Sequence, residues 1–310
     1  MSFVAGVGFA NCDILYSGMP RIPNEGEGVY AHGLDVKMGG GTPATMINLS
    51  RLGVPVKFST FLGKDMFSDV VKNELKRSGI DYTNLYEDSG IPVTVSCTII
   101  TQHDRTFVSY RDEVNITDRM LDAVYRQSVG AKFVEMHVNY LDIYRKLKKD
   151  HVAMILDTGW EDDLSIEKYA DYIELADYYT PSRKEALKIT GTSTPEDAIR
   201  QLGHYFKTPI VKLDKDGCMV MVNNEIVVVP PMPDVDRIDS TGAGDAFMSG
   251  LIYGLFHDYP VEDSVLFGNI TGGTCVKGIG CLTSYVNETE LLDIARRMTG
   301  KEYMLRSKND

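Results

Sequence analysis

A run of small residues leads directly to a carboxylate in the segment 239–245, which reads Asp-Ser-Thr-Gly-Ala-Gly-Asp. Apolar residues at helical spacing follow, so the pattern predicts a helix that begins at the small residues. Backbone amides at a helix start bind anions, and we expect those of Gly242, Ala243 and Gly244 to form an anion hole. Asp245 then lies in the first turn, where a carboxylate accepts the proton of a hydroxyl. Phosphoryl transfer to an alcohol needs this pairing.

The same residues have a plainer interpretation, in which Asp245 only caps a helix and the glycines only make a tight turn. A second glycine-rich segment, 39–45, reads Gly-Gly-Gly-Thr-Pro-Ala-Thr and also precedes a predicted helix. Such a turn holds a phosphate, holds hydroxyl groups, or is simply a loop. Neither segment alone shows whether it binds a ligand or is only a turn or a helix cap.

Taken together, the segments resemble the two signatures of the ribokinase-like carbohydrate kinases, the phosphofructokinase B family. Residues 239–245 are similar to the second signature, with Ser240 where the family often has Thr, and residues 39–53 and 63–65 resemble the first. The motifs match in order and spacing over about residues 3–300. The resemblance implies a ribokinase-like three-layer α/β/α sandwich with a mostly parallel central sheet and a small β-sheet lid. It also implies an ATP-dependent sugar kinase that uses Mg²⁺ and in which Asp245, the last residue of the second signature, acts as general base.

The resemblance also suggests which residues contact the sugar. It assigns Gly40 and Gly41 to the sugar site and Asp13 to the sugar hydroxyls, since a carboxylate accepts two such hydrogen bonds. Many relatives carry Asn where this chain has Thr45, so a single hydroxyl replaces an amide among the expected substrate contacts. The particular sugar and the hydroxyl that is phosphorylated cannot be read from these residues.

The segment 180–185, Thr-Pro-Ser-Arg-Lys-Glu, follows a predicted strand and opens a helix. Thr180 is a good N-cap and Pro181 a good first helical residue. By resemblance the segment corresponds to an Asn-x-x-Glu motif whose Glu helps to place magnesium and its waters. Glu185 fits this indirect role, while Ser182 replaces the Asn.

Residues 212–217, Lys-Leu-Asp-Lys-Asp-Gly, stand where the family has a nucleotide-binding loop. Gly217 matches that loop, Asp214 replaces a glycine, and either Lys212 or Lys215 offsets the added negative charge. A charged turn before a hairpin explains these residues equally well. By resemblance, the adenine pocket is lined by the region that contains Asn269, Gly280 and Ser284.

Some members of the resembling family bind a monovalent cation such as K⁺ through backbone carbonyls. The corresponding carbonyls here belong to Asp239, Thr241 and the segment 280–284. No side-chain pattern in the sequence indicates whether this chain binds such a cation.

Two β-rich regions, 11–38 and 90–113, interrupt the alternation of strands and helices. They either pair with each other as a lid over the main sheet or decorate the surface. Arg105 and Arg111 fall in the second region, where they either bind the carboxylate of a sugar acid or are solvated. An exposed lid edge is suited to pairing with a second copy, so we also expect a homodimer through the lid.

Elsewhere strands alternate with helices, which indicates a parallel sheet covered on both faces. The predicted strands are at 3–9, 54–58, 132–136, 152–156, 177–180 and 209–213. A hairpin around Asn223-Asn224 follows, and then helices near 243–256, 261–277 and 288–298. We expect one kinase domain over residues 1–310, with the lid segments inserted in it.

Composition excludes several other classes of protein. A net charge of -12 disfavours nucleic acid as a partner. Five cysteines without a CxxC pair indicate neither a disulfide framework nor a zinc site. The sequence shows no signal peptide and no apolar stretch near the roughly 20 residues that cross a bilayer, so we expect a cytoplasmic protein with no membrane partner.

Two alternatives to a sugar kinase stay open. One is a nucleoside kinase of the same fold, and the other is a sugar- or nucleotide-binding protein that has lost turnover. The retained carboxylate Asp245 argues against the second alternative.

Overall fold

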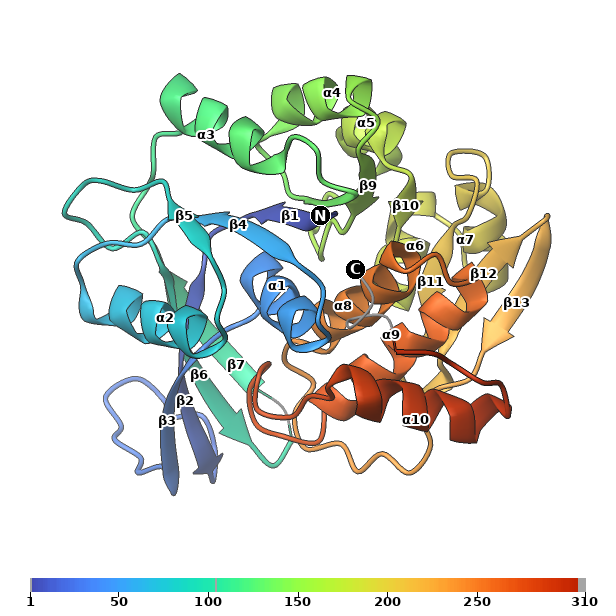
Figure 1. The fold of residues 1–310 in the computed structure, drawn as a ribbon. Coiled ribbons are helices and arrows are strands. Elements are labelled where there is room, and N and C mark those ends of the chain that lie inside the picture. Colours follow the sequence, from blue (N-terminus) through green and yellow to red (C-terminus); the bar gives the residue numbers. More distant parts are fainter. Residues whose placement is uncertain (1, 104, 306–310) are drawn as a thin grey trace.

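A six-stranded parallel sheet forms the centre of the molecule (Figure 1). The computed structural model describes residues 2–103 and 105–305. Neighbouring strands are connected by helices, as the sequence pattern predicts, and every pairing in this sheet is parallel. Its strands, in spatial order, are β10 (Tyr178–Tyr179), β9 (Ala153–Leu156), β8 (Phe133–Met136), β1 (Val4–Val7), β4 (Val56–Thr60) and β5 (Tyr82–Asn84).

Helices cover both faces of this sheet, because successive strand side chains point to opposite sides. Val4 packs into one apolar cluster, while its neighbour Ala5 packs into the other. The first cluster lies under α1 (Thr42–Arg51), α2 (Met66–Arg77), α8 (Ala243–Phe256), α9 (Val261–Cys275) and α10 (Glu288–Thr299). The second lies under α3 (Asp118–Ser128), α4 (Leu141–Lys149), α5 (Ile166–Leu175), α6 (Arg183–Thr190) and α7 (Pro195–Leu202). The predicted three-layer α/β/α sandwich is therefore confirmed.

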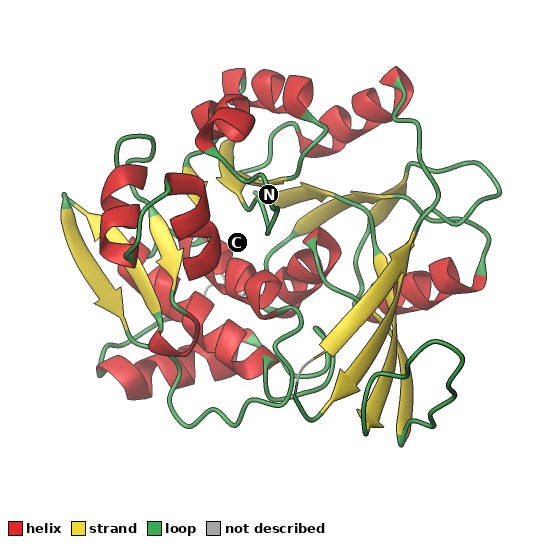
Figure 2. Ribbon diagram, turned by 180° about the vertical axis from the view of Figure 1, so that it is seen from behind, coloured by secondary structure: helices red, strands yellow, loops and turns green. Residues whose placement is uncertain are grey.

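The two irregular regions pair with each other, as the lid interpretation expects. Their strands form a separate four-stranded sheet that projects from the body at the lower left of Figure 1 and the lower right of Figure 2. The pairing of β2 with β6 joins the two regions in parallel. In spatial order the strands are β3 (Gly33–Met38), β2 (Asn11–Met19), β6 (Thr94–Thr101) and β7 (Arg105–Tyr110). Asp104, which precedes β7, lies outside the described residues.

One strand prediction is wrong. The segment 209–213 does not continue the parallel sheet, because β11 (Ile210–Lys212) pairs antiparallel with β12 (Cys218–Val222). Strand β13 (Glu225–Val229) completes this third sheet through the predicted hairpin. Three residues beyond β10, Ser182 forms an isolated parallel bridge to Lys212, which brings β11 beside the central sheet.

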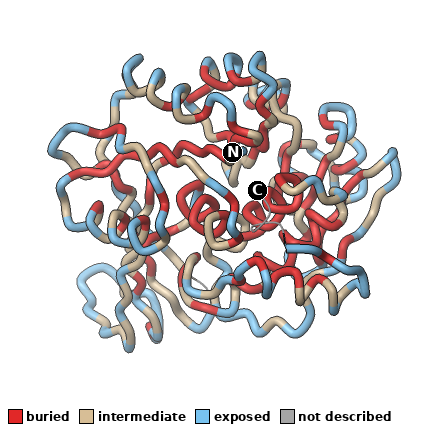
Figure 3. The backbone as a smooth tube through the Cα atoms, viewed as in Figure 1, coloured by how far each residue is buried: buried red, intermediate tan, exposed pale blue. Residues whose placement is uncertain are grey.

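Helix α8 is buried on nearly all sides, as the burial colours of Figure 3 show for the centre of the molecule. It packs against α9 at two glycines, where the helix backbones come close together. A β-carbon on Gly250 would collide with the Phe267 carbonyl, and one on Gly254 with Ser264. This close packing fixes the middle and the end of α8 in the interior, while its first residues, 243–245, are half-buried. Among the described residues, no helix has the length and apolarity to cross a membrane.

Candidate active site

The two glycine-rich segments meet at one carboxylate. The Gly41 amide, just before α1, donates a hydrogen bond to Asp245 Oδ2 at 2.8 Å. The neighbouring Gly40 lies so close to this oxygen that any β-carbon there would collide with it. Gly40 and Gly41, which sequence reasoning assigned to the sugar, therefore also hold the predicted base.

The turn before α8 requires glycine for two reasons. Gly242 is the N-cap of α8 and has a φ of 75°, in the left-handed region that favours glycine. A β-carbon on it would also collide with Cys281. The first turn of a helix has amides without intrahelical acceptors, although the Ala243 amide already donates to the Ser240 carbonyl at 3.3 Å. A helix start thus lies beside a carboxylate, and binding of an anion by the amides of Gly242, Ala243 and Gly244 stays a prediction.

The environment of Asp245 suits proton transfer. Burial raises the pKa of Asp245 to about 6, the Gly41 amide works against this rise, Asp157 adds to it and Lys212 opposes it. A carboxyl with a pKa near the working pH is both available in its ionised form and basic enough to accept a proton.

Two charged residues beside Asp245 come from the ends of strands. Asp157 follows β9, and Lys212 is the last residue of β11. Lys212 Nζ lies 3.2 Å from Asp157 Oδ2. Sequence reasoning named Lys212 only as one of two candidates to balance charge, and it did not find Asp157. The available signal was a charged residue at the carboxyl end of an apolar strand, which is where α/β proteins place ligands.

A further carboxyl, Glu135 in β8, is buried behind the base. Burial, together with the charges of Asp245 and Asp157, raises the pKa of Glu135 well above its ordinary value. Its Oε1 lies 3.4 Å from the hydroxyl of Thr45, which is also 3.4 Å from the Asp245 carbonyl. Thr45 is fully buried, so its hydroxyl joins helix α1 to this cluster. A direct contact between Thr45 and substrate stays a prediction that this burial does not favour.

The carboxylate of Asp13, in lid strand β2, lies against the first glycine segment. Its Oδ2 lies 2.6 Å from the position of a β-carbon on Gly39, so the glycine makes room for the carboxylate. Burial raises the pKa of Asp13 to about 6, with Asp239 adding to the rise and Arg105 opposing it. The lid thus presents a partly desolvated carboxyl, and its contact with sugar hydroxyls stays a prediction.

The two lid arginines differ in their surroundings. Arg105 forms an ion pair with Asp239, with 2.9 Å between Nη1 and Oδ1, and also donates to the Thr241 hydroxyl. Asp239 accepts from the Gly280 amide as well, at 2.9 Å. Arg105 thus ties the lid to the loop before α8 and already has an acidic partner. The side chains of Asp239 and Thr241 belong to this network, while their carbonyls as cation ligands stay a prediction.

Arg111 follows β7 and has no acidic partner of this kind. Its guanidinium carbon lies 3.7 Å from the centroid of the Phe9 ring, and Phe9 in turn stacks on Phe61 at 4.3 Å. No carboxylate in the described parts of the chain is within ion-pair distance of Arg111. The hydroxyl of Tyr140, which is buried near this arginine, also has no hydrogen-bond partner in the described structure.

The predicted nucleotide residues occupy structural positions in the last third of the chain. The Asn269 amide in α9 donates to the carbonyls of Val229 at 3.1 Å and Pro230 at 2.8 Å, so it fixes the end of β13. Gly217 has a φ of 89°, and a β-carbon there would collide with Val229. Gly280 has a φ of 85°. Contacts of these residues with a nucleotide stay predictions.

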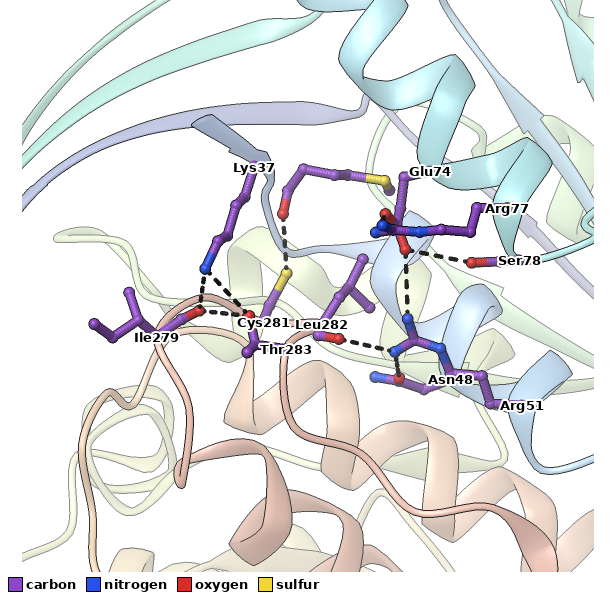
Figure 4. Close-up of polar contacts among 11 residues, drawn as sticks. Lys37, Asn48, Arg51, Glu74, Arg77, Ser78, Ile279, Cys281, Leu282 and Thr283 are labelled. Carbon is purple, nitrogen blue, oxygen red and sulfur yellow. Dashed lines mark hydrogen bonds and ion pairs between the residues drawn. The ribbon is translucent and has the colours of Figure 1, made fainter. Parts of the chain in front are cut away.

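The loop that contains Gly280 and Ser284 is held from the N-terminal part of the chain (Figure 4). Lys37 Nζ, at the end of lid strand β3, donates to the Ile279 carbonyl at 3.2 Å. Arg51 Nη1 in α1 donates to the Leu282 carbonyl at 3.1 Å. The lid and α1 therefore set the position of the predicted adenine loop.

A cavity of about 300 Å³ lies beside this loop, between the end of α9 and α10. It contains none of the residues that surround Asp245, so the chemistry is assigned to the Asp245 cluster and not to this cavity. Its lining residues are Met232, Thr274, Lys277, Tyr285, Val286, Glu290, Asp293, Ile294 and Arg297.

The predicted magnesium residue Glu185 is part of a helix cap. The N-cap of α6 is Ser182 and not Thr180, because Pro181 precedes the helix. The Ser182 amide donates to Glu185 Oε2 at 2.7 Å. Within residues 2–103 and 105–305, no group of three or more acidic, His or Cys side chains is arranged to hold a metal. Magnesium fits such a site when phosphate oxygens and waters supply most of its ligands.

Comparison with known proteins decides the family. A sequence model of the pfkB family carbohydrate kinases matches residues 8–288. The chain belongs to this family. As a pfkB-family member it is a carbohydrate kinase, a phosphotransferase with an alcohol group as acceptor.

Several curated pfkB-type kinases are similar over most of the chain. A 5-dehydro-2-deoxygluconokinase of Clostridium botulinum is 26% identical over 272 residues, which cover 78% of this chain and 79% of the relative. A ribokinase of Haemophilus influenzae is 22% identical and covers 93% of this chain and 96% of its own length.

Solved structures share the whole pfkB-kinase fold. The Arabidopsis thaliana ribokinase complexed with ribose and ATP has a TM-score of 0.82 at 21% identity, and the match covers 96% of this chain and 99% of that one. The Burkholderia thailandensis nucleoside kinase in complex with inosine has a TM-score of 0.77 at 16% identity, with 97% and 99% covered.

Proposed function

We propose that the protein transfers the γ-phosphoryl group of ATP to a hydroxyl of a monosaccharide or a sugar acid, with Mg²⁺ as cofactor. The observation that carries the proposal is the Asp245 carboxylate, which the Gly41 amide holds at 2.8 Å beside the first turn of α8. A desolvated base and an anion-binding helix start lie within one constellation, as in-line phosphoryl transfer requires.

The mechanism follows from the positions of these groups. Asp13 and the glycine segment bind the sugar and turn one hydroxyl toward Asp245. Asp245 takes the hydroxyl proton while the sugar oxygen forms a bond to the γ-phosphorus and the bond from that phosphorus to the ADP oxygen breaks. Amides of the first turn of α8 stabilise the charge on the moving group. A bound Mg²⁺ would neutralise phosphate charge, and Glu185 is the residue that would help to hold it.

A sugar acid is the substrate class that the lid favours. The Arg111 guanidinium packs against an aromatic ring and has no carboxylate partner in the described chain. A substrate carboxylate would therefore form an ion pair with it. Arg105 already has Asp239, which makes it the less suitable ligand. The curated relatives named 5-dehydro-2-deoxygluconokinase act, by that name, on a sugar acid. These two observations support the proposal independently.

A nucleoside kinase is the alternative, since nucleoside kinases share the fold. A nucleobase needs an open aromatic face for stacking. The Phe9 ring has Arg111 against it and is stacked on Phe61, which is itself fully buried, so a base finds no open face on this aromatic pair. A non-catalytic binding protein would not need a carboxylate such as that of Asp245, held in contact with Gly40 and Gly41.

Three further features belong to the proposal. The adenine is expected to bind beside the loop 280–284, K⁺ is expected to bind beside the carbonyls of Asp239 and Thr241, and the enzyme is expected to act in the cytoplasm.

A homodimer through the lid is supported by the edge strand β7 of the lid, where Phe107 and Val108 are 64% and 77% exposed. Sedimentation velocity of the wild type and of Phe107→Glu tests this assembly. A wild type that stays monomeric at micromolar concentration would exclude it.

The deciding experiment is a screen for acceptor-dependent ADP release with Mg-ATP. It compares neutral sugars, sugar acids and nucleosides, with and without K⁺. The proposal expects a sugar or sugar acid as the best acceptor. Inosine or adenosine as the best acceptor would instead establish the nucleoside kinase, and no turnover with any acceptor would favour a binding protein.

A further inference from the structure

Lys212 places a cation at the start of α8, beside the proposed base. Its side chain is only 16% exposed. Its ammonium lies 3.6 Å from the position of a β-carbon on Gly244, so it faces the first turn of the helix. It also lies 5.9 Å from the ring centroid of Phe247, one turn further along. The cation and the helix amides therefore border the same space.

The backbone of Lys212 fixes this direction. Its amide donates to the Pro181 carbonyl at 2.9 Å, and the residue pairs with Cys218 across the β11–β12 sheet. Lys215, three residues later, lies in an exposed single turn of 3₁₀ helix. The two lysines that the sequence left as equal candidates are thus distinguished, because only Lys212 is turned into the site.

The ammonium is kept charged by its surroundings. Burial alone lowers the pKa of Lys212, but Asp157, Glu185 and Asp245 raise it, and the net direction is upward. Asp157 is itself fixed, since its Oδ1 accepts from the Gly159 amide at 3.1 Å. Asp157 is the carboxylate in contact with this ammonium, at 3.2 Å, whereas Glu185 and Asp245 act on its pKa through their charges. An incoming phosphate would meet a repulsive site if the ammonium were absent.

We propose that Lys212 is a catalytic residue that binds the γ-phosphoryl group of ATP during transfer, and that Asp157 holds its ammonium in position. The inference rests on the proposed kinase function of the same site. Lys212 makes no covalent bond. Its ammonium pairs with the non-bridging oxygens of the γ-phosphoryl group and, together with the α8 amides, stabilises that group as its bond to ADP breaks.

The test compares Lys212→Met with Lys207→Met, a control variant at an exposed lysine before β11. Loss of one preorganised donor at a transition state typically lowers kcat by about 10²–10³-fold. Lys212→Met should show a loss of this order, and Lys207→Met should keep wild-type kinetics. Calorimetry without acceptor should show that Lys212→Met weakens binding of ATP about tenfold more than binding of ADP, since only ATP carries the γ-phosphate.

A second variant guards against misfolding, because Lys212→Met leaves Asp157 without its partner. The double variant Asp157→Asn/Lys212→Met removes both charges and should melt near the wild type while keeping the selective loss for ATP. Equal losses for ATP and ADP, or a kcat within a few-fold of the wild type, would overturn the role of Lys212. The calorimetric comparison needs no acceptor, so it tests Lys212 even if the screen finds no sugar substrate.

Discussion

Gly40 and Asp245 are in such close contact that the glycine has no room for a side chain on the face toward the Asp245 carboxylate. The residues are 205 positions apart in the sequence, and each belongs to a different glycine-rich segment. The next amide, that of Gly41, donates to the same carboxylate oxygen. The first signature thus shapes the surroundings of the proposed base, which lies in the second signature.

Replacing Gly40 should therefore disable the base without removing it. In Gly40→Ala the new methyl group displaces the Asp245 carboxylate, and we expect kcat to fall by at least about 10²-fold, the lower range for loss of general-base catalysis. Gly28→Ala is the matched control, since a β-carbon on Gly28 meets nothing within 4 Å. Steady-state kinetics of both variants measure the effect. Equal activity in the two would show that the contact does not matter for turnover.

Asp245→Asn should abolish most turnover while the protein stays folded. Asn keeps an oxygen for the Gly41 amide but cannot take up a proton as a carboxylate does, so kcat should fall by about 10²–10⁴-fold or more. ATP affinity should persist, because other segments are expected to bind the nucleotide. Kinetics, calorimetry and thermal melting are measured side by side. Turnover within a few-fold of wild type would exclude Asp245 as the base, and a collapsed melt would assign it a structural role.

The pH dependence should show an acid limb near the pKa of Asp245, which burial raises to about 6. The base acts in its ionised form, so activity is full above this value and is lost as pH falls through it. Asp13 also has a pKa of about 6 and would contribute to the limb through substrate binding.

A pH profile of Asp13→Asn separates the two groups. Its KM should be raised, and the acid limb of its kcat should remain near pH 6 because Asp245 is still present. Disappearance of that limb in Asp13→Asn would assign the limb to Asp13.

Arg111→Met should impair the use of an acidic acceptor. A charged hydrogen bond contributes about 1.5–3 kcal/mol, so KM for a sugar acid should rise roughly 10–150-fold while KM for a neutral sugar changes little. Arg119→Met is the control, because Arg119 is an exposed arginine whose partner is the exposed Glu87. Unchanged KM values in Arg111→Met would show that Arg111 is solvated and does not bind the acceptor.

Glu185→Gln separates metal support from helix capping. Gln still accepts from the Ser182 amide, as in other capping boxes, so the melting temperature should stay near that of the wild type. The lost charge should raise the Mg²⁺ concentration needed for half-maximal rate. A magnesium titration of kcat measures this, and an unaltered curve would leave Glu185 as a cap alone.

The sequence predicted those parts of the site that depend on local backbone chemistry. Gly40, Gly41 and Gly242 are detectable because few other residues fit the close approach of Gly40 to Asp245 and the positive φ angles of Gly41 and Gly242. The helix 243–256 has the predicted bounds, since its apolar periodicity is local. Glu135, Asp157 and Lys212 were missed or left ambiguous, because their meeting depends on which strands end beside one another. The wrong assignment of β11 has the same origin, since an isolated apolar run does not specify its partner strand.

The distance in sequence between Gly41 and Asp245 has a consequence for biosynthesis. The two residues are 204 positions apart, and a ribosome adds about 5–20 residues per second. Gly41 is therefore synthesised roughly 10–40 s before Asp245, whose carboxylate its amide will contact. A nascent chain lacks its base for most of its synthesis, so any sugar bound early by the lid and first helix cannot yet be phosphorylated. Onset of activity during translation would report docking of the last third of the chain.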